Sequence, residues 1–131
     1  IEFSTHERLH NVHTWVTYER LKAIYPMPTR DVCQLVHWRV VEDQGKLVVV
    51  GVDNDSHPEE DGYVRAHLYE GWVLTPLPGN KSCRVTSIWS VDIRGVLTDK
   101  VRTQLAQKQA AVLSSVRRFL EEYQRGSGGS Q

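Results

Sequence analysis

The feature that most constrains this chain is a run of short segments, rich in β-branched and aromatic residues, between Leu9 and Ile93. Val, Thr, Trp and Tyr favour a pleated sheet surface. The links between these segments are short. Because a parallel crossover needs about a dozen residues or more, consecutive strands should be antiparallel neighbours. The sequence therefore predicts an antiparallel sheet over most of its length.

Turn signals divide this part of the chain into six expected strands. Pro26 and Pro28 break the first from the second, because proline lacks the N–H that a strand ladder needs. Gln44-Gly45 makes a tight connection between the second and the third. The six expected strands are Leu9–Lys22, Asp31–Glu42, Lys46–Asn54, Tyr63–Tyr69, Gly71–Leu77 and Cys83–Ile93.

After Thr98 the apolar spacing becomes helical. Thr98 suits the N-cap, Asp99 suits the positive end of the helix dipole, and Gly126 lies just past the expected end. The pattern predicts an amphipathic helix of about 26 residues. The apolar positions that define it are Val101, Leu105, Val112, Val116, Leu120 and Tyr123.

Composition narrows the classes of protein and of partner. The 131 residues include 16 basic and 16 acidic side chains, and this balance argues against a nucleic-acid partner. Two cysteines are too few for a disulfide scaffold and suit a reducing, cytoplasmic location. No apolar run approaches the roughly 18–20 residues that span a bilayer. We expect one domain over residues 4–125, followed by a Gly/Ser linker or tag remnant at 126–131.

Strands followed by one long amphipathic helix predict the α+β class. The expected architecture is a curved antiparallel sheet of about six strands with the helix packed across its concave face. A helix over a strongly bent sheet leaves space beneath it. Two interpretations of that space stay open: an apolar cavity for a ligand, or a core filled by side chains.

Three short motifs occur in an order that resembles one family. They are the run Tyr25–Asp31, then Val64-Arg65-Ala66, then Asp92-Ile93-Arg94-Gly95 before the last helix. Together they resemble the START domain, the lipid-binding helix-grip family related to steroidogenic acute regulatory protein and similar in fold to Bet v1. Residues 52–58 and Cys83–Thr86 look most similar to its ceramide-transfer branch.

The resemblance covers about His13 to Tyr123, which corresponds to the later part of a START domain. A full domain of the family begins with a helix, three strands and two shorter helices, which are absent from this sequence. In the family the last strand pairs with the first. The resemblance therefore implies that Cys83–Ile93 is an exposed sheet edge.

The function implied by the resemblance is non-enzymatic and needs neither a cofactor nor a metal. A START domain holds one lipid in an apolar cavity and transfers it between membranes or senses it. The expected ligand is ceramide or another sphingolipid or phospholipid. Each buried methylene contributes about 0.8 kcal/mol, whereas a buried head group needs hydrogen-bond partners.

The resemblance also implies ligand-binding residues. The head-group site of the ceramide branch falls on Glu19, Val49 and Ser87, where Val49 replaces an amide and Ser87 a tyrosine. Val36 stands where sterol-binding members carry a cavity arginine. From the strand pattern, Gln34 shares a face with Val36 and is a further candidate.

Three more residues complete the predicted contacts. Trp89 is expected in the core or in the cavity wall. Tyr25 matches the aromatic that the family places against membranes, which implies transient membrane contact. Arg65, like Arg30, has two interpretations: a head-group ligand, or a partner of a carboxylate such as Asp31 or Asp92 that fixes a strand end.

Two other function classes stay open. The chain could be a START-like interaction module that pairs through its exposed edge strand, including as a homodimer. It could also be an enzyme of the wider helix-grip class with His37 or Glu19 as base, although no nucleophile, base and orienting group combine in the sequence. On a strand His10 and His13 point to opposite faces, so we expect no metal site there.

Overall fold

The structure is a computed structural model that describes residues 3–8, 12–23, 25–79, 81–95 and 97–127. The chain divides into two compact units, residues 1–94 and residues 95–131. The first unit contains the sheet, and the second contains the helix. The predicted α+β class, with an antiparallel sheet and one long C-terminal helix, is confirmed.

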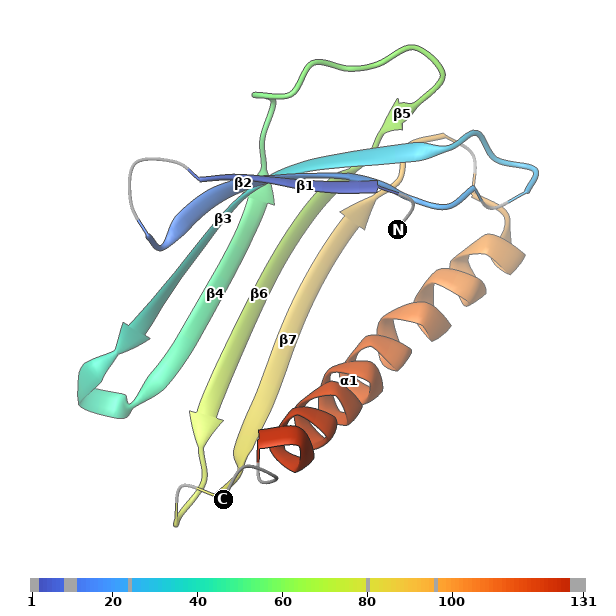
Figure 1. The fold of residues 1–131 in the computed structure, drawn as a ribbon. Coiled ribbons are helices and arrows are strands. Elements are labelled where there is room, and N and C mark those ends of the chain that lie inside the picture. The colour runs from blue at the N-terminus through green and yellow to red at the C-terminus, as the bar shows by residue number, and fades with distance from the viewer. Residues whose placement is uncertain (1–2, 9–11, 24, 80, 96, 128–131) are drawn as a thin grey trace. The chain divides into compact units, whose positions relative to one another are not determined.

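One sheet contains all the strands of the described part of the chain. Its order is β1-β2-β3-β4-β6-β7, and every neighbouring pair along this order is antiparallel. Figure 1 shows β1 and β2 running across the direction of β6 and β7, so the sheet is strongly twisted. The strands are β1 (Phe3–Arg8), β2 (Thr14–Arg20), β3 (Arg30–Val41), β4 (Lys46–Asp53), β5 (Val64–Arg65), β6 (His67–Pro76) and β7 (Cys83–Asp92).

The predicted first strand over Leu9–Lys22 is confirmed with shorter bounds, as β2, but the strand before it was not predicted. That strand, β1, forms a hairpin with β2, from Phe3 opposite Arg20 to Arg8 opposite Trp15. The segment Phe3–Arg8 reads FSTHER and carries one large apolar residue, so it shows no alternation. The segment is a strand because it pairs with β2, although its own sequence pattern does not favour one.

The prediction of two separate strands at Tyr63–Tyr69 and Gly71–Leu77 is wrong. Gly71 lies inside β6, opposite Val50 on β4 and Ile88 on β7. Hydrogen bonding to a strand on each side overrides the low strand propensity of glycine. The remaining piece, β5, pairs in parallel with the start of β3, which is not adjacent to it in the sequence, so the expectation that consecutive strands pair does not hold for β5. The other predicted strands, near β3, β4 and β7, are confirmed.

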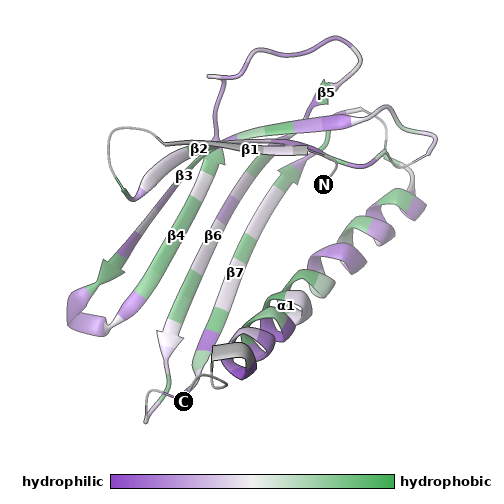
Figure 2. Cartoon of the chain, viewed as in Figure 1, coloured by the Kyte–Doolittle hydropathy of each residue, from purple (hydrophilic) through white to green (hydrophobic). Residues whose placement is uncertain are grey.

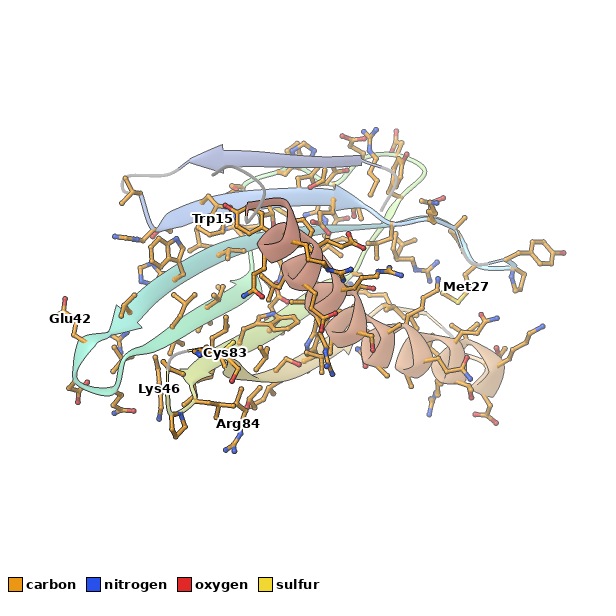
Figure 3. The ribbon with its side chains drawn as sticks, turned by 60° about the horizontal axis from the view of Figure 1, so that its bottom comes forward. Trp15, Met27, Glu42, Lys46, Cys83 and Arg84 are labelled. Atoms are coloured by element: carbon orange, nitrogen blue, oxygen red, sulfur yellow. The ribbon has the colours of Figure 1, made fainter. Side chains whose placement is uncertain are left out.

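The β3–β4 connection contains a short 3₁₀ turn, η1 (Glu42–Gln44), before the predicted glycine. Gly45 has φ of 59°, a left-handed conformation that favours glycine. Figure 3 shows Glu42 and Lys46 at this end of the sheet, together with Cys83 and Arg84 at the start of β7. The predicted tight connection at Gln44-Gly45 is therefore confirmed.

The second unit is the helix α1 (Asp99–Ser127), 29 residues long. The backbone N–H of Val101 donates to Thr98 Oγ1 at 3.4 Å, which confirms Thr98 as the N-cap. The helix continues through Gly126, so its predicted end was too early. Figure 2 shows apolar and polar residues interspersed along it. Within the described part of the chain, no helix combines the length and apolar character needed to span a bilayer.

Replacing the two inner glycines of the sheet by alanine, one at a time, should have opposite effects on stability. A Cβ at Gly71 would meet no atom within 4 Å, whereas a Cβ at Gly51 would lie 2.8 Å from Glu70 Cγ. Gly71→Ala should therefore raise the free energy of unfolding by about 0.5–1 kcal/mol. Gly51→Ala should lower it. Urea denaturation of both variants measures the difference, and equal effects would contradict the packing described at Gly51.

Candidate functional site

The strand register places every tryptophan of the chain on one face of the sheet. Residues directly opposite each other on paired strands share a face, and so do residues two apart along a strand. We call this side the tryptophan face. One of its rows is Trp15, Val36, Gly51, Glu70 and Trp89, and the next is Trp38, Val49, Trp72 and Ser87. The sequence contains 4 tryptophans, and these rows include all of them.

All the predicted ligand residues except Arg65 lie on this tryptophan face. They come from β2, β3, β4 and β7. The register places Val36, Val49, Ser87 and Trp89 in two adjacent rows of this face, whereas Glu19 and Gln34 lie further along β2 and β3, away from Ser87. Glu19 shares the face because it opposes Val32, which alternates with Gln34 along β3. The residues are Glu19, Gln34, Val36, Val49, Ser87 and Trp89.

A carboxylate lies in the middle of the tryptophan face. Glu70, on β6, is half-buried, and its Oε2 accepts a hydrogen bond from Trp72 Nε1 at 3.0 Å. The rings of Trp72 and Trp89 meet edge to face, with 5.5 Å between their centroids. Glu70 therefore lies beside Trp72 and, in the register, opposite Trp89.

Gly51 makes room for the polar groups beside it. A Cβ at Gly51 would lie 2.9 Å from Gln34 Nε2 and 3.0 Å from Glu70 Oε1. Gln34 is buried, and its Nε2 donates to the carbonyl oxygen of Leu68 at 3.2 Å. The missing side chain thus lets an amide and a carboxylate occupy the same stretch of sheet surface.

Sequence reasoning missed Glu70 because it read Gly71 as a break between strands. That reading placed Glu70 in a turn, where a carboxylate is ordinary. The signal that could have found it is the alternation Leu68, Glu70, Trp72 across the glycine. Glu19, in contrast, was found, and it lies near Ser4, whose Oγ donates to Glu19 Oε1 at 3.5 Å.

The opposite face contains a buried ion pair. Asp31 is 1% exposed and Arg65 is 7% exposed. Arg65 Nε donates to Asp31 Oδ1 at 3.0 Å, and its Nη2 donates to Oδ2 at 3.1 Å. Tyr18 donates its hydroxyl to Oδ2 at 3.0 Å. The ion-pair interpretation of Arg65 is confirmed, and it places Arg65 on the other side of the sheet from the remaining candidates.

Arg65 also holds the loop that precedes β5. Its Nη1 donates to the carbonyl oxygen of His57 at 3.1 Å, and its Nη2 to that of Pro58 at 3.2 Å. The His57 ring stacks on the ring of Tyr18 at 3.7 Å. Glu60 adds ion pairs to His57 and to Arg20. One buried cluster therefore fixes this loop to β2 and β3.

The expectation that Arg30 pairs with a carboxylate is wrong. Its Nε donates to the carbonyl oxygen of Ile93 at 3.0 Å, its Nη2 to that of Arg94 at 2.9 Å, and its Nη1 to that of Pro28. The end of β7 leaves those carbonyls turned toward the start of β3, where the buried guanidinium satisfies them.

The buried cluster shifts the pKa values of its members. Burial alone would raise the pKa of Asp31, but the hydrogen bonds from Arg65 and Tyr18 outweigh it and hold that pKa below its usual value. The hydrogen bond with Asp31 raises the pKa of Arg65. Burial raises the pKa of the Tyr18 hydroxyl. At neutral pH the cluster therefore contains an ionised pair and a neutral tyrosine.

The residues weighed for catalysis do not form a catalytic arrangement in the described part of the chain. His37 is exposed, and its Nδ1 lies 2.8 Å from Thr14 Oγ1. Cys33 is fully buried in a small core with Val16 and Tyr18. The described residues also contain no group of three metal-ligating side chains; His10 lies outside them.

Tyr25 lies in the turn between β2 and β3 and precedes a cis peptide bond to Pro26. Its side chain is 95% exposed. An aromatic ring in this position is accessible to a surface outside the protein.

Replacing Asp31 tests the energetic role of the buried pair. Asp31→Asn leaves the Arg65 guanidinium buried without its counter-charge, so the free energy of unfolding at pH 7 should fall by about 3 kcal/mol. Asp55→Asn, at an exposed acid in the same part of the chain, is the matched control. Chemical denaturation measures both, and equal stability of the two variants would contradict the role given to Asp31.

The same pair predicts a pH dependence. A carboxyl whose folded pKa is depressed contributes stability that is complete above its unfolded pKa, about 4. That contribution is lost as the pH falls through the lower, folded pKa. The stability difference between the wild type and Asp31→Asn should therefore shrink below about pH 4. A constant difference down to the acid transition would contradict this.

The comparisons with known proteins agree with this architecture. The START domain family matches residues 1–125. The crystal structure of human STARD10 is similar, with a TM-score of 0.69 and 22% identity, over 86% of this chain and 46% of that one. The lipid transfer and protein localization domain of human StarD13 (DLC2) is also similar, with a TM-score of 0.61 and 22% identity. That match covers 72% of this chain and 49% of that one.

The chain thus spans about half the length of these two structures, at 46% and 49%. No curated protein matched the sequence. START domains are generally non-enzymatic lipid-binding modules. Neither of these two structures is a ceramide-transfer protein, so the similarity to the ceramide-transfer branch stays a prediction. The match over residues 1–125 confirms the predicted family: the chain belongs to the START domain family.

Proposed function

We propose that this protein binds a single lipid against the tryptophan face and carries or senses it, without covalent chemistry. The observation that carries the proposal is the register, which gathers the expected ligand residues on one face. Membership of the START family supports the same function. The tryptophan face offers a large apolar surface, and each methylene buried there would contribute about 0.8 kcal/mol.

The proposed ligand is ceramide or another sphingolipid or phospholipid. Glu19 and Ser87 can hydrogen-bond to the hydroxyl or amide groups of such a lipid, and Gln34 lies on the same face, two residues along β3 from Val32, which opposes Glu19. Val36, Val49 and Trp89 would contact hydrocarbon. Since Val49 replaces an amide of the ceramide branch, a ceramide would be held by a partly different set of contacts.

We further propose that Tyr25 makes the membrane contact through which the lipid is exchanged. Its ring is 95% exposed, and tyrosine favours the interface between lipid and water. Arg65 supports the site only indirectly in this proposal, because its donors are bound to Asp31 and to loop carbonyls. A reducing, cytoplasmic compartment suits Cys33 and Cys83, both of which are free.

A second candidate function is strand pairing through β7. In the described part of the sheet, β7 lies at the end of the strand order, and its Ile88 is 74% exposed. Such an edge can add a strand from another chain or from a second copy. Sedimentation at several concentrations tests the homodimer: growth of a dimer with concentration supports it, and a monomer at every concentration contradicts it.

Neighbouring residues on β7 allow a matched test of the lipid-binding face. Ser87 faces Trp72 across the strands, whereas Ile88 lies on the opposite face. Ser87→Trp should fill part of the proposed site and weaken lipid binding about tenfold or more. Ile88→Trp, with the same added ring, should leave binding nearly unchanged. Binding of a lipid with a fluorescent acyl chain measures both affinities.

The unfolding transitions of the two variants provide the control, since both should remain folded. Equal affinities in Ser87→Trp and Ile88→Trp would contradict binding at the tryptophan face. Binding that is lost only in Ile88→Trp would place the ligand on the other side of the sheet.

A further inference from the structure

We propose that the face of the sheet opposite the tryptophan face binds a second copy of this chain. We call this surface the valine face. Its side chains alternate with those of the tryptophan face along β4, β6 and β7. The apolar ones are Val48, Val50, Val52, Tyr69, Val73 and Ile88. The contact uses side chains of three strands, so it differs from pairing through the backbone of the β7 edge, and it does not involve the proposed lipid site.

The valine face exposes large apolar side chains beside one another. Ile88 is 74% exposed, Tyr69 50% and Val50 43%. Between Val50 and Ile88 lies Gly71, where a Cβ would meet no atom within 4 Å. Single exposed apolar residues are ordinary on a protein surface, whereas adjoining ones mark a place where another surface binds.

The residue types of this face are nearly symmetric about one row. The row crosses three strands at Val50, Gly71 and Ile88. Two residues to either side of it, β4 carries two valines, β6 carries two large apolar residues and β7 carries two hydroxyls. These pairs are Val48 and Val52, Val73 and Tyr69, and Thr86 and Ser90. A two-fold axis along the row places each member of a pair over the other member in the second copy, so the face is complementary to itself.

The charges at the two ends of β7 favour this arrangement over the other symmetric one. Arg84 and Asp92 lie four residues from Ile88, one on each side, and both are exposed. With the axis along the row, Arg84 lies over the partner's Asp92, and Asp92 lies over the partner's Arg84. With the axis along the strands instead, both copies would bring Arg84 and Lys46 to the same end, where like charges repel.

Arg84 and Asp92 are available for this contact. Among the described residues, no ion pair involves either of them. Asp92 Oδ1 accepts the backbone N–H of Arg94 at 2.9 Å, which fixes the carboxylate at the end of β7. The guanidinium of Arg94 contacts the His67 ring. Charge-assisted hydrogen bonds between the two copies would give both Arg84 and Asp92 a partner of opposite charge.

Sedimentation equilibrium of the full chain at several concentrations tests the proposal. We expect a dimer that dissociates on dilution. Val50→Asp puts a charge in the centre of the contact and should raise the dimer dissociation constant about tenfold or more. Val40→Asp is the matched control, because Val40 is similarly exposed, at 51%, but lies on the tryptophan face. It should leave the dissociation constant nearly unchanged. Thermal unfolding checks that both variants are folded.

Exchanging the two charges tests the orientation of the copies. Arg84→Asp puts an acid over the partner's Asp92 and should raise the dissociation constant about tenfold. The double variant Arg84→Asp with Asp92→Arg restores opposite charges at both contacts and should return the dissociation constant close to that of the wild type. A double variant as weak as Arg84→Asp would overturn the arrangement with the axis along the row.

Val50 also distinguishes this dimer from one that pairs through the β7 edge. Edge pairing would leave the Val50 residues of the two copies five strand spacings apart, about 24 Å, so Val50→Asp would not affect it. A dimer that resists Val50→Asp, or one that Val40→Asp weakens equally, would therefore overturn the role of the valine face. A monomer at every concentration would overturn it as well, and it would leave lipid binding intact.

Discussion

The ion pair between Asp31 and Arg65 is the interaction on which the rest of the sheet unit depends. It joins β5 to the start of β3 and, through Tyr18, joins both to β2. Because the pair is buried, its Coulomb attraction is little screened, and losing one partner would leave a charge without solvent. The long strand β3 then sets the register of β2 on one side and β4 on the other.

The tryptophan face depends on this arrangement although it does not contain the ion pair. A slip of one residue between strands would turn every side chain to the other face. With β2, β3 and β4 fixed, the tryptophans and the polar residues among them fall on one side. The cluster around Asp31 would therefore influence the proposed ligand binding through geometry, and the surroundings of Glu70 depend on it in the same way.

Much of this could be predicted from the sequence, and the failures have physical causes. The alternation of apolar and polar residues identified β3, β4 and β7. It also predicted that Gln34 and Val36 share a face, because side chains two apart along any strand point to the same side. β1 was missed since its residues are polar and its pairing with β2 is not local. Gly71 misled the prediction at β6, because glycine in a strand looks like a turn until its two neighbours are known. Glu70 was overlooked because of this interpretation of Gly71.

The contact between Trp72 and Trp89 has a practical consequence. Two indoles that touch each other, one of them hydrogen-bonded to a carboxylate, form a built-in optical reporter in the middle of the sheet. Their emission depends on the polarity and the charge beside them. Trp38 packs edge to face against His13 instead, so it reports on a different part of the sheet. The protein's own fluorescence should thus respond to changes in the sheet without any added label.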